Sequence, residues 1–157
     1  MTPNDVPNET GFGLERFVLA QDPVWKRVCA ELRAGRKTSH WMWYVFPQIA
    51  GLGLSEMSRR YAISGLQEAR AYLAHPVLGP RLREATALVC AHEGRSAYEI
   101  MGSPDDAKLR SCMTLFADAA EDDAAEDVVT GDAALFCGAL ERFYGGEKDP
   151  ETMRRLA

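Results

Sequence analysis

The chain has 157 residues, of which 46% are hydrophobic and 26% charged, and its formal net charge is -5. This length suits one ordinary domain that buries roughly 68–70% of the surface its unfolded chain exposes, so stability requires no metal or disulfide. The apolar fraction excludes a globally disordered chain. The longest strongly apolar run, residues 41–46, is far shorter than the roughly 20 residues of a membrane-spanning helix, so we expect no membrane span.

The N-terminal residues are polar and rich in Pro, Asn and Thr. We expect residues 1–11 to form a flexible arm and residues 12–157 to form a single all-helical domain. The arm carries acidic residues and no basic one, unlike a secretory signal, which favours a cytoplasmic protein. The four cysteines lie far apart with no CxxC spacing. We interpret them as reduced, small buried side chains, with a catalytic thiol as the alternative.

Charge is distributed unevenly along the chain. Residues 1–110 hold 14 basic and 12 acidic side chains, whereas residues 111–157 hold 4 and 11. Residues 118–132 carry seven acidic side chains and no basic one, which is typical of a solvated loop or a frayed helix end, with a binding tail as the alternative. The ten basic residues of 21–83 are scattered. The overall acidity and this scatter argue against DNA binding.

Helix signals recur from Phe12 onward, and no alternating strand pattern with a hairpin turn is present. Short helices at several crossing angles predict an all-α fold, a compact multihelical single domain in which helices could stack in pairs. The predicted helices are 13–20, 23–34, 38–46, 55–63, 65–74, 77–92, 97–101, 104–120, 132–144 and 150–155.

Five sequence signals predict where helices begin. Asp22-Pro23, Ser103-Pro104 and Asp149-Pro150 place a capping residue before a proline. Ser64 with Gln67, and Ser96 with Glu99, have the spacing of a capping box. Glycines predict the ends of four helices, because a glycine closes the last turn in a left-handed conformation without steric cost. These glycines are Gly35, Gly94, Gly102 and Gly145.

The most unusual segment runs from His40 to Gln48 and holds two of the three tryptophans. Trp41, Trp43 and Tyr44 are predicted to be largely core packing, because aromatic side chains of this size dominate cores. A pocket is the alternative, with the aromatic rings as walls and with His40 and Gln48, as buried polar groups, orienting a planar ligand. For His40 alone, a hydrogen-bonded core histidine competes with a catalytic base.

A second candidate site lies on the helix predicted at 104–120. Asp105 and Lys108 are three residues apart, and Ser111 follows on the stripe of Lys108. The simplest interpretation is an ion pair between Lys108 and Asp105, and the alternative is a Lys108 that holds a phosphate or carboxylate. Arg16 is a further candidate for an anionic ligand. The Gly-Leu-Gly stretch at 51–53 could present amides to an anion, or simply be a turn before a helix capped by Ser55.

Several stretches together make the chain similar to the bacterial family known as domain of unknown function 1810, whose members are sometimes mislabelled calpastatin. The resemblance implies an all-helical fold and no established activity. The family pattern leads us to expect serine where this chain has Cys112. The residues that carry the resemblance are 14–17 with Gln21, 40–43, 46–48, 51–53 with Ser55, 61–63, 72–79, Asp105, 108–109 and 114–116.

Two functional hypotheses remain open from the sequence. In the first, the chain is a ligand-binding domain for a small anionic or planar molecule, with a site drawn from His40, Trp41, Trp43, Tyr44, Gln48, Asp105, Lys108, Ser111 and Arg16. In the second, it is a protein-protein interaction module without catalytic activity. No motif predicts a metal or another cofactor. Neither a reaction nor an oligomeric state follows from these residues, although pairing of the acidic end with the basic 21–83 segment of a neighbour is conceivable.

Overall fold

The computed structural model describes residues 11–122 and 129–157, and this part of the chain contains ten helices and no strand. One isolated parallel bridge joins Ile49 and Ile63. The prediction of an all-α fold is therefore confirmed. The predicted arm, except for Gly11, and residues 123–128 of the acidic stretch lie outside the described residues.

Each predicted helix has a counterpart in the structure. The aromatic segment differs most from expectation, since only four residues of the predicted 38–46 are helical, and the helix predicted at 55–63 is only five residues long. The helices are α1 (Glu15–Gln21), α2 (Trp25–Ala34), α3 (Met42–Val45), α4 (Glu56–Arg60), α5 (Leu66–Ala74), α6 (Leu78–Cys90), α7 (Ala97–Met101), α8 (Asp105–Asp122), α9 (Val129–Tyr144) and α10 (Pro150–Leu156).

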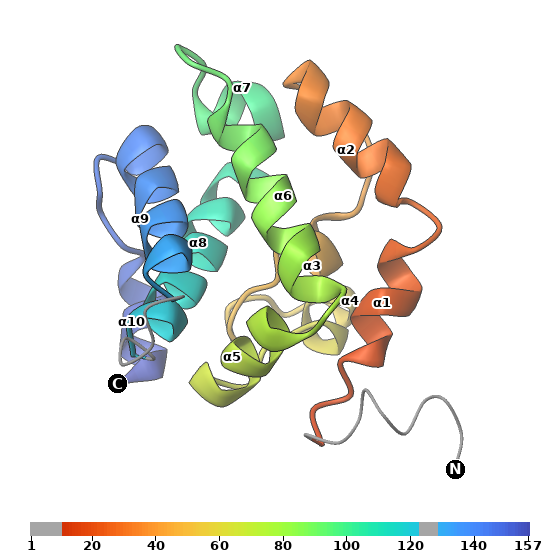
Figure 1. Ribbon diagram of the computed structural model, residues 1–157, viewed down its shortest axis with the longest axis vertical. Helices are drawn as coiled ribbons and strands as arrows, with labels where there is room; N and C mark the ends of the chain where they lie inside the picture. The colour runs from red at the N-terminus through yellow and green to blue at the C-terminus, as the bar shows by residue number, and fades with distance from the viewer. Residues whose placement is uncertain (1–10, 123–128) are drawn as a thin grey trace.

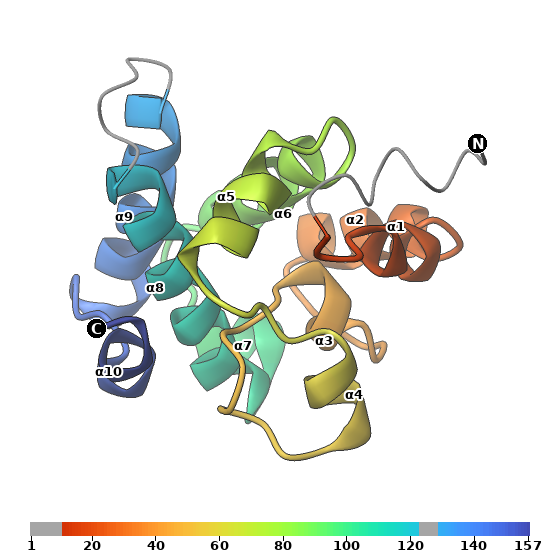
Figure 2. The same cartoon turned by 90° about the horizontal axis from the view of Figure 1, so that it is seen from below.

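The helices pack around α6 and α8. In Figure 1, α8, α9 and α10 lie on one side of α6, and α1 and α2 lie on the other. The view from below in Figure 2 shows the same division, with α3 and α4 beneath the centre. α8 packs against α9, α5, α7 and α10, and α6 packs against α2, α5 and α9. The long helices thus form a frame on which the short helices α3, α4 and α7 are held.

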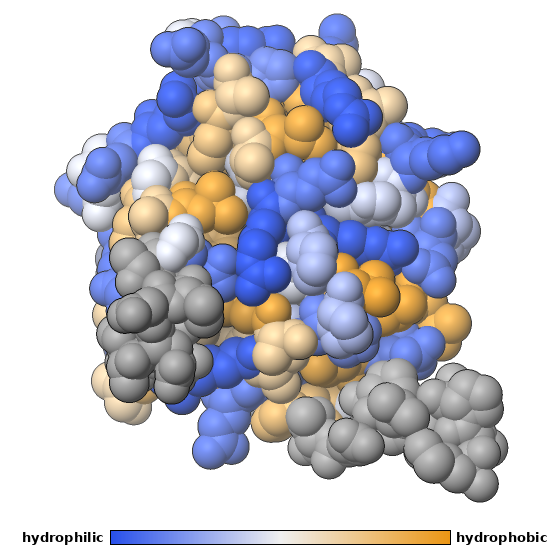
Figure 3. All heavy atoms as spheres, in the orientation of Figure 1, coloured by the Kyte–Doolittle hydropathy of each residue, from blue (hydrophilic) through white to orange (hydrophobic). Residues whose placement is uncertain are grey.

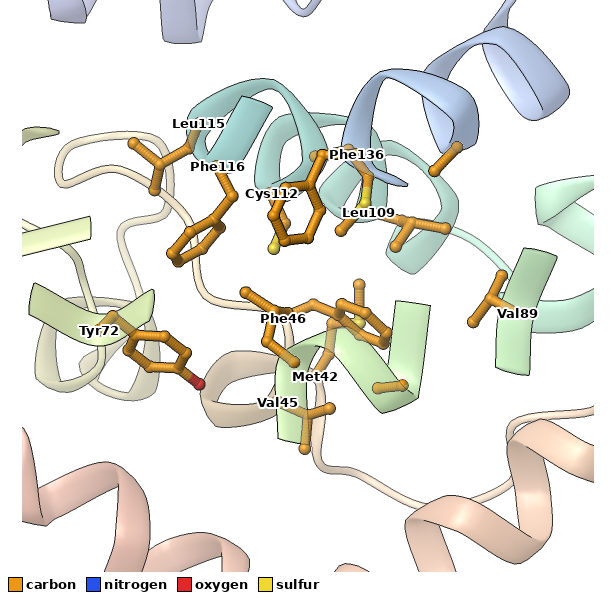
Figure 4. Packing of buried hydrophobic residues seen from close by; sticks show 14 of the residues in the cluster. Met42, Val45, Phe46, Tyr72, Val89, Leu109, Cys112, Leu115, Phe116 and Phe136 are labelled. Atoms are coloured by element: carbon orange, nitrogen blue, oxygen red, sulfur yellow. The ribbon is translucent and has the colours of Figure 1, made fainter. Parts of the chain in front are cut away.

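The centre of the core is an aromatic row between α5, α8 and α9. The Phe116 ring lies 5.3 Å from Tyr72 and 6.0 Å from Phe136, measured between ring centroids. Figure 4 shows Met42, Val45 and Phe46 of the α3 region below Phe116 and Phe136 in the same cluster. All these side chains are buried. The aromatic segment is therefore anchored by burying its apolar side chains against α8.

Three helix starts match the sequence signals. Ser96 and Glu99 form the predicted capping box at α7. Asp149 caps α10 by accepting a hydrogen bond from the Thr152 amide, with Pro150 as the first helical residue. Ser55 caps α4 through the Ser58 amide. These signals are local, so they could be recognised without knowledge of the fold.

Two predicted caps are wrong, because another side chain binds the capping residue. Asp22 ends α1 instead of starting α2, and its carboxylate pairs with Arg81 at 2.9 Å. Ser64 makes no box with Gln67; its amide and hydroxyl both donate to Glu68 at 2.8 Å. The predicted glycine stop at Gly94 is also wrong, since α6 ends at Cys90 with Ala91 as its cap.

The length and hydropathy of the helices determine whether any of them could span a membrane. Across residues 11–122 and 129–157, every helix is too short or too polar to cross a membrane.

Candidate functional site

Three of the nine sequence candidates meet at an open cavity of about 240 Å³ between the loop after α3 and the helices α8 and α10. We call it the Lys108 cavity. Three predicted residues, Gln48, Lys108 and Ser111, line it together. The full lining is Gln48, Leu52, Gly53, Pro104, Ala107, Lys108, Ser111, Asp149 and Glu151.

The loop wall of the cavity is held by backbone hydrogen bonds and by two glycines. The Gln48 carbonyl accepts from the Ile63 amide at 2.9 Å, and the Ala50 amide donates to the Ile63 carbonyl at 2.8 Å. Gly51 has φ +98°, and a Cβ there would collide with the Arg155 guanidinium. A Cβ on Gly53 would collide with the Ser58 side chain. The Gly-Leu-Gly stretch is thus a tight turn packed between α4 and α10.

The helical wall is fixed by Asp149. One of its carboxylate oxygens accepts from the Ser111 hydroxyl at 3.2 Å, the Thr152 amide at 3.0 Å and the Thr152 hydroxyl at 2.5 Å. The Asp149 amide donates to the Thr114 hydroxyl at 2.8 Å. Asp149 therefore ties the start of α10 to α8. Sequence analysis recognised this residue as a cap, but the contact with α8 could not be read from its neighbours in the chain.

Lys108 is the cation of the cavity, and its predicted partner is shared. The Lys108 ammonium lies 3.9 Å from Asp105, whereas the Lys37 ammonium lies 2.7 Å from the other oxygen of the same carboxylate. Lys108 is also 5.7 Å from the centroid of the Trp43 ring. The predicted ion pair between Lys108 and Asp105 is present, but it is the longer of the two. Sequence analysis missed Lys37 because it lies about 70 residues away in the chain, too far for a helical-spacing argument.

Six of the nine sequence candidates lie outside the lining of this cavity. Trp43 and Asp105 lie beside Lys108, and the other four lie elsewhere. Trp41 is 1% exposed, and its indole N–H donates to Glu31 at 2.9 Å. The Tyr44 ring packs against Tyr61, and burial raises the pKa of Tyr44. His40 is exposed, so the expectation that it is a buried polar group is wrong. The reason is the shortness of α3, which leaves His40 in the loop before it.

Arg16, the fourth of these candidates, has a structural environment that uses its whole guanidinium. It donates to the carbonyls of Phe12, Gly13, Arg60 and Ala62 and to the Glu68 carboxylate, at distances of 2.6–3.0 Å. An arginine side chain has five N–H donors, and these contacts occupy all five. Arg16 therefore joins the chain before α1 to the segment between α4 and α5, and it has no donor left for a ligand.

Glu31 is a central residue that sequence analysis missed. Its carboxylate accepts from the amides of Thr38 and Ser39, from the Ser39 hydroxyl and from the Trp41 indole, at 2.6–3.1 Å. Burial acts to raise the pKa of Glu31, but these hydrogen bonds outweigh it and lower the pKa to about 2. Glu31 thereby fixes the loop that leads to α3. A glutamate near the end of an amphipathic helix gives no sequence signal of such a role.

The cysteines give no sign of nucleophilic chemistry. All four are free thiols; Cys29 and Cys112 are buried, whereas Cys90 and Cys137 are half-buried, less than predicted. Burial raises the pKa of each thiol, which disfavours the reactive thiolate. Within the described residues, no three His, Cys, Asp or Glu side chains come together as potential metal ligands.

The fold and the cavity define an all-α protein with a small open cavity between its helices. The chain belongs to the family described as protein of unknown function DUF1810, whose model matches residues 11–156. It is 52% identical to the conserved hypothetical protein Rv1873 from Mycobacterium tuberculosis. The crystal structure of that protein superposes on this chain with a TM-score of 0.84, and the match covers 93% of this chain and 97% of the other. Among curated proteins, none matches this chain. The family resemblance read from the sequence is confirmed.

Proposed function

We propose that this protein binds a small anionic molecule in the Lys108 cavity, with the Lys108 ammonium opposite the negative charge. The observation that carries the proposal is the sharing of Asp105. Lys37 holds that carboxylate at 2.7 Å, and Lys108 holds it only at 3.9 Å. A charge-assisted hydrogen bond is short, near 2.7–2.9 Å, so Lys108 retains donors for a ligand.

The two acidic residues of the lining do not oppose this proposal. The Asp149 oxygen near Ser111 already accepts three hydrogen bonds. Glu151 forms ion pairs with Arg154 and, at 3.1 Å, with Arg155. The Glu151 charge is therefore paired within the protein, and the Asp149 charge is stabilised by hydrogen bonds from neutral donors. The Gln48 side chain adds a neutral amide to the lining, which can orient a polar ligand.

A volume of about 240 Å³ lies just below the usual 300–1,000 Å³ of small-molecule sites. It suits a ligand of the size of an amino acid or a sugar phosphate. The four free cysteines are compatible with a reducing compartment, and we include a cytoplasmic location in the proposal. Because the described side chains do not define a nucleophile and a base in the cavity, no reaction is part of it.

The test is a thermal-shift screen of the full chain against nucleotides, sugar phosphates and amino acids. A ligand at 100 times its Kd adds about 2.7 kcal/mol to the free energy of unfolding, which is readily visible. Lys108→Met should remove the shift, and Gln48→Ala should reduce it. The matched control is Lys26→Met, because Lys26 is an exposed lysine of α2. A shift that survives Lys108→Met would overturn the proposal.

His40→Ala separates this site from the wider pocket considered from the sequence. His40 does not line the Lys108 cavity, so this variant should keep the full shift. Loss of the shift in His40→Ala, with Lys108→Met unaffected, would move the site to the aromatic segment and away from α8.

The interaction-module hypothesis has less support. Among the described residues, the exposed large hydrophobic side chains are Leu19, Leu54 and Tyr98, and they come from three separate segments. On the face shown in Figure 3, hydrophobic patches are small and interrupted by hydrophilic residues. A docking surface for another protein is usually a contiguous apolar patch.

A further inference from the structure

A second cavity, of about 380 Å³, lies just before the start of α8, where the residues after α2 meet the α7 region. Arg36, Lys37, Arg95, Tyr98 and Glu99 are among its lining residues, and we call it the arginine cavity. Figure 1 shows the last turn of α2 and the α6–α7 connection at the same end of the molecule. None of the sequence candidates for the ligand site lines it.

The frame of the arginine cavity is fixed by contacts between distant segments. The Lys37 amide donates to the Ile100 carbonyl at 2.7 Å. His92 Nε2 lies 2.6 Å from the Leu32 carbonyl and donates to it. Gly35 has φ +74° and ends α2, and a Cβ built on it would lie only 2.7 Å from Arg95 Nη1. The Arg95 guanidinium therefore reaches the backbone next to Arg36, and both arginines line the cavity.

The charged side chains around this cavity differ in whether an oppositely charged group pairs with them. Lys37 is neutralised by Asp105 at 2.7 Å. Glu99 is held in the capping box, where its carboxylate accepts from the Ser96 amide at 2.8 Å. Arg95 lies close enough to Glu99 to act on it electrostatically. Among residues 11–122 and 129–157, however, no carboxylate pairs within 4 Å of the guanidinium of Arg36 or Arg95. Two exposed guanidinium groups thus remain for an oxyanion.

We propose that the arginine cavity binds the phosphate group of a small phosphate monoester that carries a planar ring, of which a nucleoside monophosphate is the simplest example. The planar, forked donors of two guanidinium groups match the oxygens of a phosphate better than an ammonium does. Tyr98 lines the same cavity with 63% of its surface exposed, and its ring offers a face for stacking. This site is independent of the Lys108 cavity, and it stands whether or not that cavity binds a ligand.

The experiment is a calorimetric titration of the full chain with adenosine monophosphate, adenosine and inorganic phosphate at fixed ionic strength. We expect saturable binding of the monophosphate, weaker binding of phosphate alone, and weakest binding of adenosine. The double variant Arg36→Gln/Arg95→Gln should weaken the monophosphate at least about tenfold. Tyr98→Ala should weaken the monophosphate and leave inorganic phosphate unchanged.

Two controls make the result specific. Arg59→Gln removes an exposed arginine of α4 and should change nothing. Lys108→Met should also leave this binding intact, which separates the two cavities.

Absence of saturable monophosphate binding to the wild type would overturn the proposal. An equal loss in Arg59→Gln would do so as well, since it would indicate attraction by overall charge alone. A loss confined to Lys108→Met would assign the binding to the other cavity and overturn this one. Thermal unfolding of each variant verifies that it is folded.

Discussion

The α8 region and the 35–64 segment are held in place by different forces. Between Leu109 and Ala120 of α8, every residue except Arg110 and Asp118 is buried, so this helix is fixed by apolar packing on several sides. The 35–64 segment has two very short helices, α3 and α4. Besides the burial of α3, it depends on carboxylate and guanidinium side chains, Glu31 and Arg16, that bind its backbone.

The contrast shows how the Lys108 cavity is built. One wall, with Lys108 and Ser111, belongs to the packed α8. The opposite wall, with Gln48 and Gly53, belongs to the hydrogen-bonded segment. Apolar packing is spread over many contacts, whereas a polar clamp is concentrated in a few atoms. The two walls should therefore respond to different substitutions, and the following predictions test that difference.

Phe116→Ala should have the largest effect on stability. Phe116 is fully buried between Tyr72 and Phe136, and removing such a ring leaves a cavity. The free energy of unfolding should fall by about 3–5 kcal/mol, measured by urea denaturation. Leu19→Ala is the control, because Leu19 is 65% exposed, and it should cost less than about 0.5 kcal/mol. A small loss in Phe116→Ala would mean that packing does not dominate the α8 region.

Glu31→Gln should have an intermediate effect that is local to the 35–64 segment. The amide offers a single neutral acceptor oxygen in place of a carboxylate that accepts four hydrogen bonds, and we expect a loss of about 1–3 kcal/mol. Hydrogen exchange should accelerate at residues 38–41 while the amides of α8 stay protected. Glu93→Gln, at an exposed glutamate, should change neither. Equal acceleration in α8 would show that the clamp and the packed helix are not separable.

The same carboxylate predicts a pH dependence. Burial acts to raise the pKa of Glu31, but the hydrogen bonds from Ser39, Thr38 and Trp41 lower it from 4.5 to about 2. A depressed pKa in the folded state adds stability that is fully present above the unfolded value and is lost as pH falls through the folded value. The stability difference between wild type and Glu31→Gln should therefore shrink between about pH 4.5 and pH 2. A difference that stays constant over this range would contradict the assignment.

The helix caps should give the smallest effects, and they extend the comparison. Asp149→Ala removes the cap of α10 and its contact with Ser111, and we expect a loss of about 1–2 kcal/mol. Ser55→Ala removes only the cap of the short exposed helix α4, with an expected loss of about 0.5 kcal/mol. Thermal unfolding of both variants measures the order. If Ser55→Ala were the more destabilising, the 35–64 segment would depend on α4 more than on its side-chain clamps.

Sequence reasoning located the helices because their signals are local. The capping box of Ser96 and Glu99 and the Asp149 cap depend on residues three or four positions apart. The wrong caps have the opposite character. Asp22 pairs with Arg81, about 60 residues away. Ser64 bonds to Glu68, four residues along the chain, and Glu68 is in turn paired with Arg16, 52 residues away. Local sequence patterns do not identify such partners, because several carboxylates and cations in the sequence could pair equally well.

The prediction of the candidate site shows the same difference between local signals and long-range contacts. Gln48, Lys108 and Ser111 were recognised as unusual polar residues, and the structure brings them to one cavity. Sequence analysis overlooked Lys37 and Glu31, because a charged residue near a helix end is usually solvated. It also expected a buried His40, since the apolar pattern of 38–46 suggested a longer helix than the four residues of α3. Helical periodicity orients side chains only where the helix forms.

The lining of the Lys108 cavity comes from three stretches, 48–53, 104–111 and 149–151, separated by about 40–100 residues of chain. Contacts between such distant stretches require closure of long loops, and they form late in folding. A chain that has folded only its first seven helices has one wall of the cavity and lacks the other. Occupancy of this cavity would therefore report that folding is complete, and a bound ligand would stabilise the whole molecule at once rather than any single part of it.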